Sequence, residues 1–297
     1  STHKTSSAAS DVYKRQTRCS QASAMFDQRR TQAQSCCLSF GTVTGEKLMG
    51  MITVRAVGSV GVLTLNNPPH NLIGRDFIEE FCCAQERAVE DGMRAILIRS
   101  DLRHFCAGAD VSALDREGVE ASITLDRLES IPIPTVAAVH GAVLGGGFEL
   151  ALTCDFIIAA QSAQIGSVEV AIGLAPLLGA VQRLTERAGP ARAKEITMLG
   201  RRYSPDVLER WGVINLVTTD DELHSASLSL AQQLASGPTL AISAIKHIAR
   251  LASTDGLRAA DLALADELAP MWSSKDVKRG MKAMLETGPG TAVFEGD

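Results

Sequence analysis

The hydrophobic positions after residue 51 follow two periods, one typical of strands and one typical of helices. Two short β-branched runs, 52–57 and 60–65, are separated by a Gly-Ser pair and predict a β-hairpin. Apolar residues then recur at helical spacing over residues 77–88. The continuous apolar run within 94–100 predicts a buried strand. This part of the chain therefore alternates as an α/β protein does.

Residues 134–152 form the stretch around which the rest of the chain is arranged. A β-branched and alanine-rich run is broken by Gly141 and by Gly145-Gly146-Gly147, and a helix-forming run with Glu149 in its first turn follows. Glycines at that place leave backbone N–H groups bare beside the positive end of a helix, which favours negative charge. The relevant charge is a developing oxyanion, because no Lys or Ser/Thr follows the glycines as a P-loop requires. The alternative is a tight turn between strand and helix.

The second half of the chain ends in a helical tail. Residues 155–160 and 213–218 predict two further strands. The helices predicted after them are 221–236, 239–253, 257–269 and 274–286. Ser273 and Asp276 predict a capping box for the last of these helices. A helical tail after an α/β body suggests an appendage that packs on the body or on a neighbouring subunit.

The first 48 residues differ from the rest in composition. Ser, Thr, Gln and Arg dominate, and the apolar residues show no period, so we expect this stretch to be disordered. One interpretation is a mitochondrial transit peptide, which shares the Arg- and Ser-rich, acid-poor composition. The other is translated upstream or vector-derived sequence with the natural start at Met49 or Met51. The missing amphipathic stripe favours the second interpretation.

Composition excludes several classes of partner. A net charge of −5 and an aromatic content of 4% argue against a nucleic-acid partner. The seven cysteines have neither metal-like spacing nor a secreted disulfide pattern, which favours a reducing compartment. The longest weakly charged stretch contains Pro and Gly and does not predict a membrane span. We therefore expect no nucleic acid, no membrane and no metal, and a cytoplasmic location unless residues 1–48 are a genuine transit peptide.

Two other stretches carry candidate chemistry. Residues 104–111 follow a strand and are built of small residues, so their backbone could lie against a ligand. Cys106 within them has no charged neighbour and is interpreted as a small buried hydrophobe. Residues 165–176 are mostly apolar and contain one carboxylate, Glu169, which burial would suit to proton transfer. The alternative for Glu169 is an exposed position on a loop edge.

The three stretches together resemble the crotonase (enoyl-CoA hydratase/isomerase) superfamily. The likeness rests on 105–110, on 140–150 with its glycine triplet, and on 166–169, and it continues over essentially all of 51–294. The resemblance implies an α/β fold, a spiral of ββα turns followed by a C-terminal helical trimerisation region. The domain organisation expected from it is an extension at 1–48, an acyl-CoA-binding core at 49–231 and an oligomerisation region at 232–297. Members of the family assemble as trimers or as pairs of trimers, so we expect a homotrimer or a dimer of trimers.

The resemblance also implies roles for particular residues. Two backbone N–H groups, those of Ala109 and Gly146, would hold the thioester oxygen of an acyl-CoA. Glu149 and Glu169 match the two glutamates that hold one water molecule against the double bond in hydratases. The acyl-CoA would lie along residues 107–112. The substrate-binding residues implied are Ala107, Ala109, Asp110, Val111, Ser112 and Gly146. No cofactor is expected, since CoA is part of the substrate.

This sequence departs from the family pattern in three places. Ser167-Val168 replaces a frequent Gln-Pro before the second glutamate. Leu177-Leu178 stands where small residues are usual, which narrows the expected acyl pocket. Ser112 occupies a position that is Lys in many hydratases, so one contact to the CoA phosphates is missing. Acyl chain length and CoA affinity depend on these positions.

The function expected is enoyl-CoA hydration, the reversible addition of water to a trans-2-enoyl-CoA to give a 3-hydroxyacyl-CoA. Glu149 and Glu169 occurring together favour this reaction over enoyl-CoA isomerisation, which in this family can run on the second glutamate alone. A non-catalytic CoA-binding or scaffold protein is the alternative from another class. Acyl-CoA binding without product would identify it.

Overall fold

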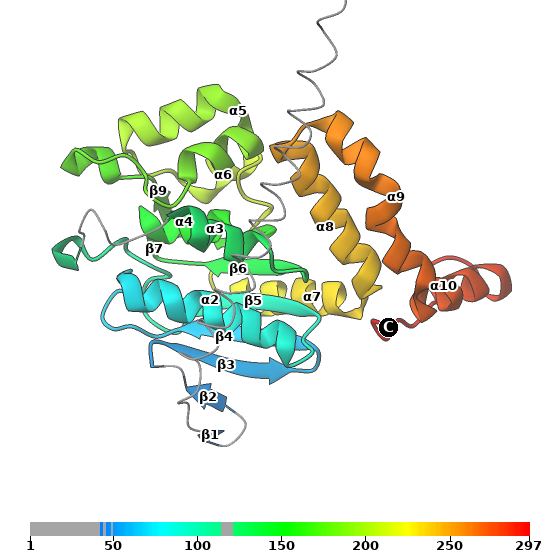
Figure 1. The fold of residues 1–297 in the computed structure, drawn as a ribbon. Coiled ribbons are helices and arrows are strands. Elements are labelled where there is room, and N and C mark those ends of the chain that lie inside the picture. The colour runs from blue at the N-terminus through cyan, green and yellow to red at the C-terminus, as the bar shows by residue number, and fades with distance from the viewer. Residues whose placement is uncertain (1–41, 44–45, 49, 114–120) are drawn as a thin grey trace, which may run out of the picture. The chain divides into compact units, whose positions relative to one another are not determined.

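The computed structural model describes residues 42–43, 46–48, 50–113 and 121–297. Its main sheet has eight strands in the order β1-β2-β3-β4-β5-β6-β8-β10, and β7 and β9 form a separate parallel pair (Figure 1). The strands are β1 Thr42–Val43, β2 Glu46–Leu48, β3 Ile52–Val57, β4 Val60–Leu65, β5 Ala95–Ser100, β6 Thr135–Val139, β7 Ala142–Leu144, β8 Phe156–Ala160, β9 Gln164–Gly166 and β10 Leu216–Thr218. The helices are α2 Arg75–Glu90, α3 Ala121–Glu129, α4 Gly146–Leu152, α5 Ala180–Leu199, α6 Pro205–Arg210, α7 Leu223–Ser236, α8 Thr239–Thr254, α9 Leu257–Ser273 and α10 Lys275–Glu286. Short 3₁₀ turns are η1 Val111–Ala113 and η2 Glu169–Ile172.

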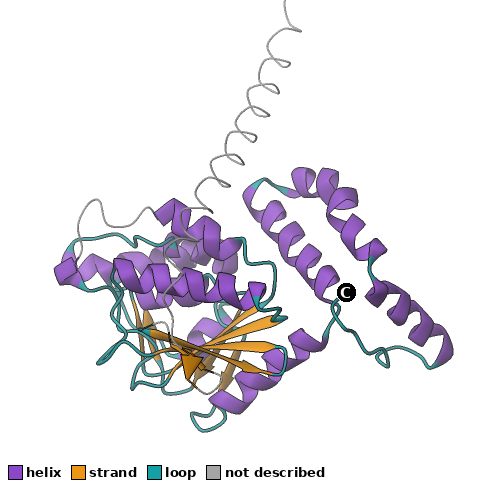
Figure 2. Cartoon of the chain, turned by 60° about the horizontal axis from the view of Figure 1, so that its bottom comes forward, coloured by secondary structure: helices purple, strands orange, loops and turns teal. Residues whose placement is uncertain are grey.

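The main sheet is antiparallel at one side and parallel at the other. Strands β1 to β4 pair antiparallel, and β4, β5, β6, β8 and β10 pair parallel. The predicted hairpin and the buried third strand are thereby confirmed. Figure 2 shows the strands fanning out with helices on both sides, as a largely parallel sheet requires.

The core follows the two-residue alternation of the strands. In register across β4, β5, β6 and β8, one buried row consists of Leu63, Ile98, Ala137 and Ile157. The alternate residues of the same strands belong to the core cluster that includes Leu223, Ala231 and Ala235 of α7. Because side chains are buried on both faces, the strands read as continuous apolar runs in the sequence.

Composition predicts disorder for residues 1–48, but residues 42–43 and 46–48 form the strands β1 and β2. β2 pairs with β3, and β1 pairs with β2, so both extend the edge of the sheet. The free backbone N–H and C=O groups at the edge of β3 pair with β2, and amino-acid composition does not predict such pairing. The remainder of the predicted disordered stretch lies outside the described residues.

The C-terminal helices match their predictions except at one junction. The cap of α10 is Ser274, whose hydroxyl accepts the N–H of Val277 at 3.1 Å. The predicted capping box of Ser273 with Asp276 is therefore wrong. Helix α9 continues to Ser273 instead of ending at residue 269, and the Asp276 carboxylate instead accepts backbone N–H groups of the C-terminal tail.

Two basic side chains link α8, and the residues just before it, to residues next to the strands of the main sheet. Lys246 donates to an oxygen of Asp155 at 2.8 Å and to the carbonyl of Ile133 at 3.1 Å. Arg94 donates to the carbonyl of Gly237, just before α8, at 2.6 Å.

The boundary expected between residues 231 and 232 falls inside α7, which packs on the sheet. None of the described helices is both long and apolar enough to cross a bilayer.

Candidate active site

The glycine triplet connects β7 to α4: Gly145 forms the turn, and Gly146 and Gly147 are the first residues of the helix. Gly145 adopts φ +52° and ψ −124°, a backbone conformation that a residue with a Cβ rarely takes. Its N–H donates to the carbonyl of Gly166 at 2.9 Å, which ties the turn to the neighbouring strand β9. All seven residues of α4 are buried. The turn therefore has a fixed place relative to β7 and β9, beside the main sheet (Figure 1).

Gly147 allows α4 to lie directly against the segment that follows β5. A Cβ added at Gly147 would come within 2.4 Å of the carbonyl oxygen of Cys106 and 2.6 Å of its side chain. Cys106 is fully buried, and burial raises the pKa of its thiol to about 12. Its prediction as a small buried hydrophobe is confirmed. The close approach of backbone to backbone brings residues 106–110 beside the start of α4.

The two amides predicted to hold a thioester oxygen lie close together. Ala109 pairs with Ile73 in an isolated parallel bridge, in which Ile73 donates to Gly108 and receives a bond from Asp110. Among the described residues, no carbonyl accepts a hydrogen bond from the N–H of Ala109 or of Gly146. A Cβ built on Gly146 would lie 3.8 Å from the nitrogen of Ala109. Two unpaired donors that lie close together, one of them at the start of α4, can bind an anionic oxygen.

Glu149 lies in the first turn of α4 and is 2% exposed. Its Oε1 accepts the N–H groups of Leu178 at 2.7 Å and of Ala180 at 3.1 Å, at the start of α5. The pKa of Glu149 is raised to about 7, chiefly by burial and in addition by the nearby charge of Glu169, and the backbone donors oppose this rise. A carboxyl group with this pKa can exchange protons near neutral pH.

Glu169 lies at the start of η2, and its carboxylate points back toward the glycine turn. Oε1 is 3.3 Å from the Cβ position of Gly145, and Oε2 accepts the hydroxyl of Ser167 at 2.6 Å. Oε1 is buried, with no hydrogen-bond partner among the described residues. The alternative of a fully exposed loop-edge carboxylate is thereby excluded for this oxygen.

The structure thus brings the two glutamates to the same glycine turn. The N–H of Glu149 bonds to the carbonyl of Gly145, and Glu169 contacts Gly145 from the side of β9. The charge of Glu169 is accordingly one of the causes that raise the pKa of Glu149. A water molecule or substrate group placed beside Gly145 would therefore lie within reach of both carboxyl groups.

The other predicted binding residues form a rim near the two amides. Ala107 is half-buried, and its N–H bonds to the carbonyl of His70 at 3.0 Å. Asp110 accepts the N–H and the hydroxyl of Ser112, at 3.0 and 2.6 Å. Val111 is 62% exposed at the start of η1, and residues 114–120 lie outside the described part of the chain.

Some polar contacts of the site were not predicted from the sequence. The backbone donors of Leu178 and Ala180 reach Glu149 only because α5 starts beside α4, and no residue type signals that approach. The Ser167 hydroxyl is two residues from Glu169, and this spacing was the available signal. Among the described residues, no group of three or more His, Cys, Asp or Glu side chains is arranged to hold a metal ion.

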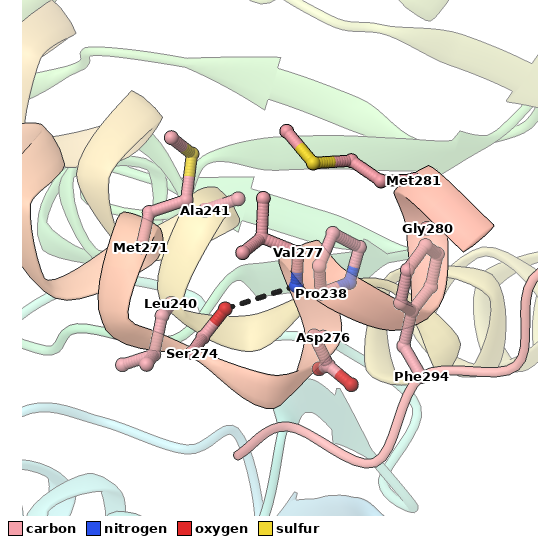
Figure 3. Close-up of a pocket in the computed structure, with 10 residues that line it drawn as sticks. All are labelled: Pro238, Leu240, Ala241, Met271, Ser274, Asp276, Val277, Gly280, Met281 and Phe294. Atoms are coloured by element: carbon pink, nitrogen blue, oxygen red, sulfur yellow. Dashed lines mark hydrogen bonds between the residues drawn. The ribbon is translucent and has the colours of Figure 1, made fainter. Parts of the chain in front are cut away.

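An apolar groove of about 240 Å³ lies away from these residues, among the C-terminal helices (Figure 3). Its lining includes Pro238, Leu240, Met271, Val277, Met281 and Phe294. The carboxylate at its edge, Asp276, is already bonded to Arg279 and to two backbone N–H groups. The groove therefore offers apolar surface but no free group for proton transfer.

Known proteins share both the sequence and this architecture. A profile described as enoyl-CoA hydratase/isomerase matches residues 55–296. A probable enoyl-CoA hydratase of Bacillus subtilis (strain 168) is 32% identical over 252 residues, which cover 80% of this chain and 96% of the relative. A carnitinyl-CoA dehydratase of Salmonella enteritidis PT4 is 35% identical over 203 residues, covering 65% and 78% respectively.

Solved structures match over a similar span. An enoyl-CoA hydratase subunit I from Geobacillus kaustophilus HTA426 has a TM-score of 0.77 at 34% identity, covering 83% of this chain and 98% of its own. An enoyl-CoA hydratase from Bacillus anthracis also has a TM-score of 0.77, at 28% identity, covering 83% and 100%. The similarity therefore includes the sheet and the glycine turn together with the C-terminal helices.

Proposed function

Because this chain belongs to the enoyl-CoA hydratase/isomerase family of the crotonase superfamily, we propose that it is an enoyl-CoA hydratase. Its reaction would be the reversible addition of water to a trans-2-enoyl-CoA, with a 3-hydroxyacyl-CoA as product. The observation that carries the proposal is the meeting of Glu149 and Glu169 at Gly145, next to the unpaired amides of Ala109 and Gly146. The hydratase and dehydratase names of its relatives support the same reaction class.

The amides of Ala109 and Gly146 would hold the thioester oxygen of the substrate. Attack of water on the β-carbon moves the electron pair of the double bond toward that oxygen and forms an enolate. Donors that are already oriented stabilise the enolate without rearrangement, and one such donor contributes about 3 kcal/mol to transition-state stabilisation. The acyl-CoA would lie along Ala107, Asp110, Val111 and Ser112.

The two glutamates would then divide the proton transfers. Oε1 of Glu149 is occupied by two backbone donors, which leaves Oε2 to take the proton of the attacking water. The water oxygen bonds to the β-carbon as this proton leaves. Glu169 gives its own proton to the α-carbon, which completes the addition. One proton has entered the pair and one has left it, so the pair returns to its starting state through exchange with solvent.

The proposed reaction needs no further cofactor, because the hydroxyl group and the hydrogen that are added together amount to one water molecule, and CoA is part of the substrate. We also propose that the chain works as a homotrimer or a dimer of trimers. Large apolar side chains of α8, α9 and α10 are exposed in the single chain, among them Ile245, Leu262, Trp272 and Leu285. Exposed apolar area of this kind favours association between subunits. Sedimentation velocity would measure the size of the assembly.

Hydration of crotonyl-CoA, followed as loss of absorbance, tests the proposal. We expect turnover in the wild type and losses of about a hundredfold or more in Glu149→Gln and in Glu169→Gln. Both substitutions keep the size of the side chain, and circular dichroism with calorimetric acyl-CoA binding controls for folding. Undiminished turnover in both variants would contradict the mechanism.

The same assay separates the alternatives. A 3-enoyl-CoA whose double bond shifts faster than crotonyl-CoA is hydrated would identify an isomerase. Calorimetric binding of acyl-CoA without any product would identify a binding protein. A panel of acyl-CoAs that differ in chain length would then define the preferred substrate.

A further inference from the structure

Ser167 occupies a fixed and fully enclosed position beside the glutamate pair. Its side chain is 1% exposed, and it follows β9 directly. β9 is held to the glycine turn, because Leu144 and Gly166 are in register and Gly145 donates to the carbonyl of Gly166. On the opposite side, a Cβ on Gly166 would lie 2.4 Å from the carbonyl oxygen of Arg201. The backbone before Ser167 is therefore confined from two sides.

Glu169 has much weaker support from its own segment. The η2 residues that follow it, Val170 and Ile172, are 44% and 57% exposed, so the turn contacts α5 but is only partly enclosed. Among the described residues, the hydroxyl of Ser167 is the one side-chain group that hydrogen-bonds to the Glu169 carboxylate. It engages Oε2, while Oε1 stays unpaired and faces Gly145.

We propose that Ser167 is a positioning residue that orients the Glu169 carboxylate for proton transfer. The inference rests on the proposed function and assigns a task to a residue outside the glutamate pair and the substrate rim. The hydroxyl donates its one proton to Oε2, so Oε2 acts as acceptor and the transferable proton resides on Oε1. Oε1 faces the turn that presents the amide of Gly146, which is where the α-carbon of a bound thioester would lie. The O–H bond of Glu169 breaks as the new C–H bond forms, and the Ser167 proton does not move.

Without the hydroxyl, no side-chain hydrogen bond would decide which oxygen of Glu169 faces the turn and carries the proton. Substrate would still bind, because Ser167 is enclosed and contributes no group to the predicted rim of residues 107–112. The inference therefore requires a loss in turnover without a loss in binding. It also requires that the loss disappears when Glu169 can no longer donate a proton.

The experiment compares wild type with Ser167→Ala, Glu169→Gln and the double variant. Ser227→Ala is the matched control, because Ser227 is also fully buried and its hydroxyl bonds within α7, on the sheet. Three quantities are measured: hydration of crotonyl-CoA, exchange of the α-hydrogens of butyryl-CoA with D₂O by NMR, and the calorimetric Kd for butyryl-CoA. The exchange reaction reports proton transfer at the α-carbon without addition of water.

We expect Ser167→Ala to slow hydration and α-hydrogen exchange about tenfold, with Kd changed by less than about twofold. Ser227→Ala should leave all three quantities within about twofold of the wild type. In the Glu169→Gln background, Ser167→Ala should add less than about twofold, because the group that it orients is gone.

Two results would overturn the inference while the proposed function stands. One is a Ser167→Ala variant with normal hydration and exchange in a protein whose Glu169→Gln variant is impaired. The other is a full additional loss in the double variant, which would reveal a general structural role. A wild type that neither hydrates crotonyl-CoA nor exchanges α-hydrogens would instead refute the proposed function, and the inference would fall with it.

Discussion

The two glutamates of the site differ in the segment that carries them and in the hydrogen bonds that hold their carboxyl groups. Glu149 belongs to a helix whose residues are all buried, and two backbone donors hold one of its oxygens. Glu169 begins a 3₁₀ turn with exposed neighbours, and a single side-chain hydroxyl holds its carboxylate. The first arrangement fixes both the position and the proton affinity of a group. The second fixes an orientation while leaving the segment open to solvent.

This difference predicts which substitutions should disturb each carboxyl group and whether stability or catalysis should change. Changes to the backbone packing under α4 should act on the fold and on Glu149 together. Changes around η2 should act on catalysis with little effect on stability. Five measurements would test that separation, and their expected effects range from a loss of stability to a change in chain-length preference.

The first concerns packing beneath Glu149. Gly147→Ala would place a methyl group 2.4 Å from the carbonyl oxygen of Cys106, and buried backbone cannot move aside cheaply. We expect the free energy of unfolding to fall by about 3 kcal/mol or more in urea titrations. Gly74→Ala is the control, since a Cβ there meets no atom within 4 Å. Equal stability of the two variants would mean that α4 does not depend on this contact.

The second concerns the turn that both glutamates share. Gly145→Ala introduces a Cβ at φ +52° and presses it against Oε1 of Glu169. We expect hydration of crotonyl-CoA to slow about a hundredfold, with a loss of stability of about 1–2 kcal/mol. Gly58→Ala carries similar backbone strain at φ +60° with open space around it. If both variants lose the same activity, backbone strain rather than the contact with Glu169 is responsible.

The third uses the raised pKa of Glu149, which burial moves from 4.5 to about 7. Its neutral form is favoured in the folded state, so this contribution to stability is fully present below about pH 4.5 and is lost as pH rises through 7. Relative to wild type, Glu149→Gln should therefore gain stability between pH 4.5 and pH 8, by at most about 3 kcal/mol. Unfolding by urea at several pH values measures the difference. A pH-independent difference would show that Glu149 titrates normally.

A companion measurement ties that pKa to the other glutamate. Glu169→Gln removes a like charge near Glu149, so the pH at which the stability difference develops should move downward. The two variants and their combination give the coupling directly. An unchanged midpoint would place the carboxyl groups too far apart to share a water molecule.

The smallest effect is expected at the edge of the acyl pocket. Leu177 lies in the loop whose backbone N–H groups face Glu149, and its side chain is 47% exposed. Leu177→Ala should raise kcat/KM for a ten-carbon enoyl-CoA relative to crotonyl-CoA by about threefold to tenfold. Stability should change by less than about 0.5 kcal/mol. Leu199→Ala, at the far end of α5 with 49% exposure, should leave the ratio unchanged.

The elements of this protein could be predicted well from its sequence, because their hydrophobic patterns are local. The hairpin of β3 and β4, the buried strand β5 and the series of C-terminal helices all follow from such patterns. The prediction failed where tertiary contacts decide. Ser274 replaces Ser273 as the cap of α10, and β1 and β2 take their partners from the edge of β3.

The sequence by itself determined the residue types on which the proposed chemistry depends. Glycines at 145–147 permit a turn that other residues would not adopt, and two carboxylates with apolar neighbours predict proton transfer. Only the tertiary structure decided that these groups meet. Residue 169 follows residue 149 by a strand, a turn and a second strand, and the pairing of β7 with β9 returns the chain to the same glycine. The pairing joins segments distant along the chain, and the start of α5 and the hydroxyl of Ser167 then set which oxygen each glutamate leaves free.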